Sequence, residues 1–204
     1  MVAADYRTPD AGRHFYPLLR QTADRCGAAL IFDEIVTGFR FALGGMQEYC
    51  KITPDMAVFA KGIANGMPLS VYCGKARWMD GFDRAIVSST YGGETLSLAA
   101  AKATIRVYRE EPVIEHLWKM GRLMWGSLGE LFRRYGLPAT IPGDFPVGFF
   151  QFSGDGAAEL RARFLRGVCR HGVTLYNGGY VNYSHRESDI QEALDRIEAA
   201  IREL

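Results

Sequence analysis

Short apolar runs alternate with longer amphipathic stretches along this chain. Unbroken apolar runs predict strands buried on both faces, over Ala28–Phe32, Met56–Ala60 and Leu69–Cys73. Apolar residues at helical spacing predict helices over Thr8–Cys26, Glu94–Glu110, Val113–Tyr135, Gly156–His171 and Ser188–Leu204. Helices that alternate with buried strands are typical of an α/β sheet.

The pattern changes after Pro138. Prolines and glycines surround an aromatic, strand-like stretch at Val147–Phe152, and shorter strand patterns follow at Val173–Tyr176 and Tyr180–Tyr183. Together with the last two helices, these strands predict an α+β unit. The sequence therefore predicts two parts, residues 1–112 and residues 113–204, with the helix Val113–Tyr135 as their link.

Composition excludes several classes of protein. The formal net charge is +1 and basic residues form no block, so nucleic acid is not expected as a partner. No apolar run approaches the ~20 residues that span a bilayer, and the start lacks a signal-peptide core, so we expect a cytoplasmic protein without membrane contact. The four cysteines are far apart, without zinc-ligand spacing, and predict reduced thiols and no metal site.

Two charged residues end the first two predicted strands. Asp33 follows the run Ala28–Phe32, and Lys61 follows Met56–Ala60. In an open α/β sheet, ligands bind beyond the carboxyl ends of the strands. A lysine there can form a Schiff base with a carbonyl cofactor, and a carboxylate can hold a pyridine nitrogen protonated. Spacing alone allows an alternative, in which Asp33 caps the next segment and Lys61 is a solvated charge.

A third segment combines glycines with the start of a helix. Residues 88–101 read SSTYGGETLSLAAA. The glycines permit a close backbone approach, and free amides at the helix start can receive a phosphate. As a bare pattern, the segment suits an ordinary helix cap equally well.

The amino-acid sequences of these segments resemble those of a known family. Residues 30–40, LIFDEIVTGFR, and residues 59–70, FAKGIANGMPLS, are similar to the signature motifs of class III pyridoxal-phosphate-dependent aminotransferases. The resemblance implies that Asp33 contacts the pyridine nitrogen and that Lys61 holds the cofactor as an internal aldimine. The separation of the two residues, 61 − 33 = 28, is similar to that in the glutamate-1-semialdehyde aminomutase branch.

The same resemblance gives Thr90 a role. It matches the threonine that contacts the cofactor phosphate of the neighbouring subunit, which implies a homodimer with shared active sites. Residues 92–95, GGET, depart from the Ser-Gly-His/Asn-Pro of many members, so no substrate follows from this motif.

Glu34 is expected to be structural, and Arg40 either braces the sheet edge or binds a substrate carboxylate.

The resemblance covers the carboxy-terminal half of a family member. It implies fold type I, here as part of the large domain with a mostly parallel sheet plus the small α+β domain. It also implies pyridoxal 5'-phosphate as cofactor and amino transfer between a small amine or amino acid and an oxo acid or aldehyde. Two alternatives stay open: intramolecular transfer of the aminomutase type, and an inactive fragment. Without the other half of the large domain, an uncovered sheet edge is expected.

Overall fold

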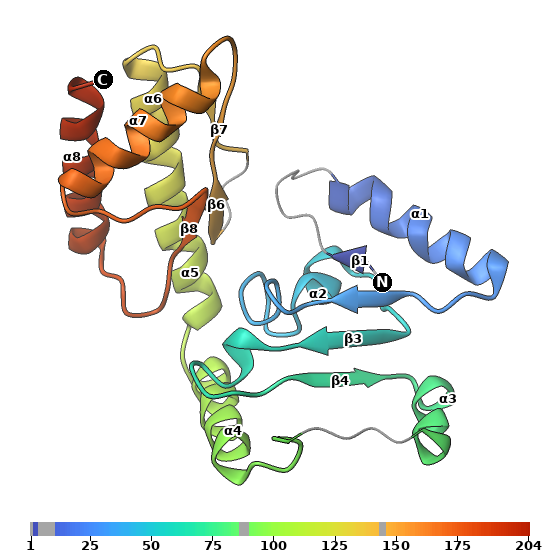
Figure 1. The fold of residues 1–204 in the computed structure, drawn as a ribbon. Helices are drawn as coiled ribbons and strands as arrows, with labels where there is room; N and C mark the ends of the chain where they lie inside the picture. The colour runs from blue at the N-terminus through green and yellow to red at the C-terminus, as the bar shows by residue number, and fades with distance from the viewer. Residues whose placement is uncertain (1, 4–10, 86–89, 143–145) are drawn as a thin grey trace. The chain divides into compact units, whose positions relative to one another are not determined.

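The computed structural model describes residues 2–3, 11–85, 90–142 and 146–204 (Figure 1). The described residues form two compact units that divide after Ile114, within helix α5 (Val113–Gly121). The assignment of residues 1–112 and 113–204 to a large and a small domain stays a prediction. The expected cap at Thr8 and the loop residues Ser88 and Ser89 lie outside the described part of the chain.

The first unit is built on a four-stranded sheet. Its strands follow one another in chain order: β1 (Val2–Ala3), β2 (Ile31–Asp33), β3 (Met56–Phe59) and β4 (Val71–Gly74). β1, β2 and β3 are parallel, and β4 is antiparallel to β3. The α/β sheet predicted from the apolar runs and the mostly parallel order implied by the resemblance are therefore confirmed. β2, β3 and β4 are each shorter than the run that predicted them, and β1 was not predicted.

Helices and turns connect these strands. The two long helices are α1 (Ala11–Cys26) and α4 (Thr95–Glu110), as their periodicity predicts. The sequence did not predict the short helices α2 (Met46–Cys50) and α3 (Ala76–Met79) or the 3-10 segments η1 (Lys61–Ile63) and η2 (Asp80–Arg84). Segments of five residues or fewer are too short to show a helical period.

Two apolar clusters hold this unit together. Tyr16 of α1 packs on Phe32 of β2, with ring centroids 5.4 Å apart, and both side chains are buried. Phe39, Ile63, Ala64 and Ala101 form the second cluster, which joins the loop after β2, the segment η1 and helix α4. This second cluster packs α4 against the segment that begins with Lys61.

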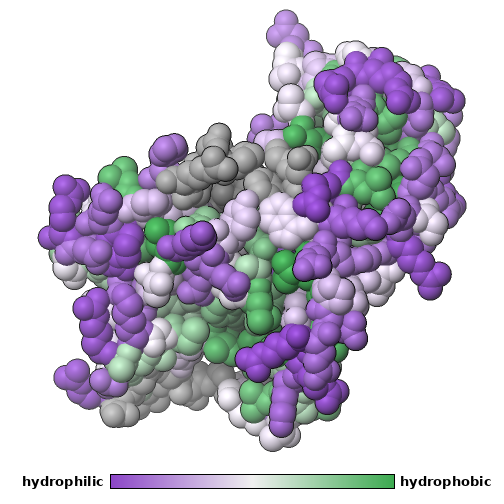
Figure 2. All heavy atoms as spheres, turned by 180° about the vertical axis from the view of Figure 1, so that it is seen from behind, coloured by the Kyte–Doolittle hydropathy of each residue, from purple (hydrophilic) through white to green (hydrophobic). Residues whose placement is uncertain are grey.

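Part of the apolar surface of the first unit is uncovered. Among the described residues, β4 is the last strand of the sheet, and its Tyr72 is 42% exposed. Leu96, Leu98 and Val107 of α4 are also exposed. Hydrophobic side chains reach the molecular surface on the face shown in Figure 2.

The second unit contains three helical segments and four short strands. α5 continues into the π-helical segment η3 (Arg122–Gly126) and α6 (Ser127–Arg134), which confirms the predicted helix to within one residue. The strands are β5 (Ala139–Thr140), β6 (Val147–Phe149), β7 (Gln151–Phe152) and β8 (Gly178–Tyr180). The remaining helices are α7 (Ala157–Arg170) and α8 (Glu187–Arg202).

The strand predictions near residue 178 were wrong. The structure places no strand at 173–176, and the strand β8 is Gly178–Tyr180 rather than Tyr180–Tyr183. β8 pairs antiparallel with β6, so that Gly148 faces Gly179. A Cβ on Gly148 would overlap the buried ring of Trp125. The strand lies at the glycines because residues with a side chain would collide with this ring. β-Propensity does not reveal this requirement.

The core of the second unit is aromatic at its centre. Three buried rings meet there: Phe132 of α6, Phe164 of α7, and Phe150, which lies between β6 and β7. Their ring centroids lie 5.5 to 6.3 Å apart. Ile190, Leu194 and Ile197 bury one face of α8. Within the described residues, no helix is both long enough and apolar enough to cross a bilayer.

Candidate functional site

The structure brings two of the three predicted site residues to one edge of the sheet. Asp33 is the last residue of β2, and it pairs with Val58 of the parallel strand β3. Lys61 follows two residues after β3 ends at Phe59 and begins the 3-10 segment η1. Both side chains therefore belong to the carboxyl ends of adjacent parallel strands, where ligands of open α/β sheets bind.

Lys61 has an unusual backbone conformation. Its φ is +48°, in the left-handed region that non-glycine residues seldom adopt. Such a conformation costs about 1 to 3 kcal/mol and persists only where the surrounding structure imposes it. The side chain is exposed, so its amine is accessible from solvent. An accessible amine can form a Schiff base with a carbonyl compound.

The turn after β2 orients Asp33. The Ile35 amide donates a hydrogen bond to Asp33 Oδ1 over 3.1 Å, and the side chain is half-buried. The adjacent Glu34 is fully buried. Glu34 accepts hydrogen bonds from the Thr37 hydroxyl, from the Met46 amide at 2.9 Å and from the Gln47 amide at 2.8 Å. These contacts give Glu34 the structural place expected from the sequence.

Thr90 lies in the exposed turn that leads into α4, on a different element from Asp33 and Lys61. The expectation of free amides at the start of α4 is wrong for two of them. The Glu94 carboxylate accepts the Leu96 and Ser97 amides, each over 2.7 Å. The segment is thus a helix cap, and an incoming phosphate would compete with the carboxylate of Glu94 for these amides.

A second charged group, not foreseen from the sequence, lies before β3. Asp55 is fully buried and accepts from the Leu30 amide at 2.9 Å. It also pairs with Arg20, Lys75 and Arg77, at 2.8, 2.9 and 3.0 Å respectively. Burial alone would raise the pKa of the Asp55 carboxyl, but the amide and the three cations hold this pKa far below its usual range.

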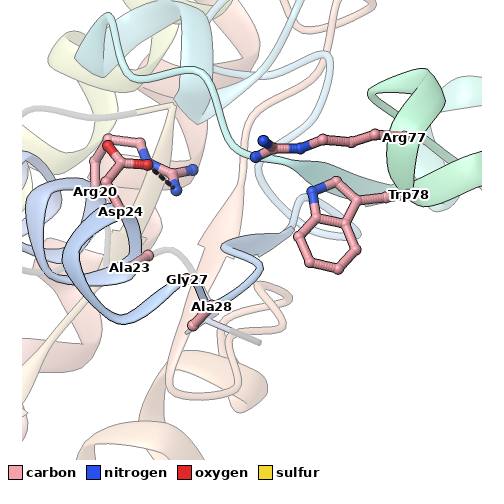
Figure 3. A pocket seen from close by; sticks show the side chains of 7 residues that line it. All are labelled: Arg20, Ala23, Asp24, Gly27, Ala28, Arg77 and Trp78. Atoms are coloured by element: carbon pink, nitrogen blue, oxygen red, sulfur yellow. Dashed lines mark hydrogen bonds and ion pairs between the residues drawn. The ribbon is translucent and has the colours of Figure 1, made fainter.

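Two of the partners of Asp55, Arg20 and Arg77, line a pocket of about 240 Å³ (Figure 3). Arg20 and Asp24 of α1 lie on one side, and Arg77 lies over the ring of Trp78, 5.4 Å from its centroid, on the other. Both arginines already pair with carboxylates. β3, four residues long, separates this group from Lys61 by roughly 13 Å, so it belongs to the opposite end of the strand.

No local signal identifies the Asp55 group in the sequence. Its three cationic partners are 20 to 35 residues away along the chain, and none lies in a motif. Among the described residues, no group of three His, Cys, Asp or Glu side chains is placed to hold a metal ion. The candidate site consists of Asp33 and Lys61 at the carboxyl edge, and the loop that Glu34 holds follows Asp33 directly in the chain.

Comparison with known proteins places the chain in a family. Residues 10–201 match the model of the aminotransferase class-III family. Since this match covers most of the chain, the protein belongs to that family, and the resemblance inferred from the two motifs is confirmed.

Curated relatives include proteins named as transaminases and as aminomutases. The chain is 28% identical over 207 residues to 3-aminobutyryl-CoA aminotransferase of Cloacimonas acidaminovorans, covering 98% of this chain and 50% of that protein. It is 32% identical over 213 residues to glutamate-1-semialdehyde 2,1-aminomutase of Opitutus terrae, covering 96% and 50%. The chain thus spans about half the length of these relatives.

Solved structures confirm the partial α/β fold. The internal aldimine form of the FumI protein of Sphingopyxis sp. MTA144, which contains PLP, superposes with a TM-score of 0.87 at 25% identity. The match covers 93% of this chain and 46% of FumI. An omega-transaminase of Sphaerobacter thermophilus, at 22% identity, has the same fold with a TM-score of 0.84.

Proposed function

We propose that this chain provides the lysine-bearing half of a class III aminotransferase that binds pyridoxal 5'-phosphate. The placement of Asp33 and Lys61 at the ends of two adjacent parallel strands carries the proposal. Family membership and the PLP-containing structure of FumI support it. The amino group would pass between a small amine or amino acid and an oxo acid or aldehyde.

The residues at the carboxyl edge fit this cofactor. The exposed amine of Lys61 would attach to the cofactor's aldehyde carbon, and the Asp33 carboxylate, oriented by the Ile35 amide, would hold the pyridine nitrogen protonated. The bound cofactor supplies an electron sink for the substrate carbanion. As a free amine, Lys61 would be the base that removes the proton from the substrate carbon and returns it.

The experiment adds pyridoxal phosphate to the purified 204-residue chain, reduces it with borohydride and locates the modified lysine by mass spectrometry. We expect modification at Lys61 in the wild type and its loss in Lys61→Ala. Lys102→Ala, which removes an exposed lysine of α4, is the matched control and should label like the wild type. Folded wild-type chain without modification at Lys61 would contradict the proposal.

A second candidate, intramolecular amino transfer, is favoured by the aminomutases among the relatives. Amino transfer within one molecule needs no separate amino acceptor. Turnover that depends on an added oxo acid or aldehyde acceptor therefore supports the aminotransferase, whereas conversion of glutamate 1-semialdehyde alone supports the aminomutase. The remaining alternative, an inactive fragment, predicts neither activity when the other half of a class III enzyme is supplied.

We further propose that the active protein is a homodimer in which Thr90 contacts the cofactor phosphate of the neighbouring subunit. The exposed position of Thr90 in the turn before α4 supports this arrangement. In a dimer assembled with cofactor, Thr90→Val should weaken pyridoxal phosphate binding and leave pyridoxal binding unchanged. Equal effects on the two compounds would refute the phosphate contact.

A further inference from the structure

We infer that the buried carboxylate of Glu34 is a positioning residue that fixes both Asp33 and Lys61 through the loop between β2 and α2. This inference rests on the proposed function for its meaning in catalysis, because it assumes that these two residues act on the cofactor. It assigns a role to an acid that does not itself face the candidate site.

The hydrogen bonds of Glu34 close the loop at both ends. Its carboxylate accepts from the Thr37 hydroxyl at the start of the loop and from the Met46 and Gln47 amides at the start of α2. All three groups donate, so only a carboxylate, with two accepting oxygens, satisfies them together. The fit is close, because a Cβ on Gly45 would lie 2.5 Å from Glu34 Oε2.

The main chain of Glu34 attaches the loop to the sheet and to Asp33. Its amide donates to the Val58 carbonyl of β3 over 2.8 Å, and its carbonyl accepts from Gly38 over 2.8 Å. The next residue, Ile35, donates its amide to the Asp33 carboxylate. A shift of Glu34 would therefore change the orientation of Asp33.

The far side of the same loop packs against the segment that carries Lys61. A Cβ on Gly38 would lie 2.6 Å from the Phe59 ring, and one on Gly62 would lie 3.4 Å from Cβ of Phe39. The rings of Phe39 and Phe59 pack edge to face, 5.9 Å apart. Because Phe59 and Gly62 flank Lys61 on both sides, the loop limits the positions open to its strained backbone.

The first test uses amide hydrogen exchange in the 204-residue chain without cofactor. In Glu34→Gln, one oxygen becomes an amide group that faces a donor, so we expect exchange at least tenfold faster at residues 35–47 and at residues 60–66. Helices α7 and α8 of the second unit serve as internal reference. Thr37→Val, which removes a single donor, should give the same pattern to a smaller degree.

Two control variants test whether the effect of Glu34→Gln comes from its lost charge alone or from a general loss of stability. Glu48→Gln makes the same charge change at an exposed carboxylate that accepts the Gly44 amide, and should leave residues 60–66 unchanged. Asp55→Asn weakens the opposite end of β3. Faster exchange at residues 35–47 of Glu34→Gln without any change at residues 60–66 would overturn the inference, as would unchanged exchange in both segments.

The second test follows borohydride-trapped pyridoxal phosphate on Lys61 as a function of pH. We expect at least a tenfold loss of trapping in Glu34→Gln, and profiles within twofold of the wild type in Glu48→Gln and in folded Asp55→Asn. Equal loss in Glu34→Gln and Asp55→Asn would reduce Glu34 to a general stabilising residue. If the wild type itself takes no label, the proposed function fails, while the exchange experiment still decides the role of Glu34.

Discussion

Replacing Asp55 with asparagine should destabilise the first unit severely. Asp55 is fully buried, and its hydrogen bonds come from the Leu30 amide and from Arg20, whose side chain is only 15% exposed. Hydrogen bonds to a charged group contribute about 1.5 to 3 kcal/mol each. Lys75 and Arg77 are 44% and 64% exposed, so solvent screening limits each of them to less than about 1 kcal/mol.

The expected loss in Asp55→Asn is therefore about 3 to 5 kcal/mol in the free energy of unfolding, the usual cost of breaking a buried ion pair. Urea unfolding followed by circular dichroism measures this loss, and exchange of the β2 and β3 amides assigns it to the first unit. Asp24→Asn is the matched control, because Asp24 binds the same arginine from a position that is 63% exposed. A loss below about 1 kcal/mol in Asp55→Asn would refute the reasoning.

The contribution of Asp55 also has a defined pH dependence. Because the pKa of this carboxyl is lower in the folded chain than in the unfolded chain, its stabilisation is complete above the unfolded value of about 3.9. The stabilisation decreases as the pH falls through that value towards the folded pKa. The difference in stability between wild type and Asp55→Asn should thus be constant from pH 8 to about 5 and should shrink below about pH 4.

Three further predictions follow from local packing and charge. Gly148→Ala should lower the free energy of unfolding by about 1 to 3 kcal/mol or more, because its methyl group would overlap Trp125. Gly129→Ala, in an open position of α6, should raise the free energy of unfolding by up to about 1 kcal/mol. Urea unfolding compares the two variants. Burial raises the pKa of the Cys50 thiol to about 11, so at pH 8.5 iodoacetamide should alkylate the three exposed cysteines well before Cys50, and equal rates would contradict this. Glu94→Ala should speed hydrogen exchange at the two amides that its carboxylate accepts, with the middle of α4 unchanged as control.

The candidate site could largely be predicted from the sequence, because each of its residues lies in a short sequence pattern that can be recognised by itself. The apolar runs that end at Asp33 and Lys61 mark strand ends, and parallel strands bring their carboxyl ends to one edge without further information. The motifs around these two residues then identified the family, which the match over residues 10–201 confirms. The roles of Asp33, Lys61 and Thr90 in binding the cofactor stay predictions that the labelling experiments test.

The environment of these residues depended on contacts that local patterns do not encode. The carboxylate of Glu34 reaches amides 12 and 13 residues further along the chain, and Asp55 collects partners up to 35 residues away. A side chain's hydrogen-bonding capacity can be read from its type, but its partners depend on which segments the fold brings within about 3 Å.

The sequence by itself thus determined the alternation of helices and strands, the family, and the edge of the sheet at which Asp33 and Lys61 lie. Only the tertiary structure decided that Glu34 closes the loop between β2 and α2 and that β8 lies at Gly178–Tyr180. The physical reason is the separation along the chain between the residues that interact. Periodicity and motifs reflect neighbours along the chain, whereas burial, hydrogen-bond partners and close packing against a ring such as Trp125 depend on residues that meet only after folding.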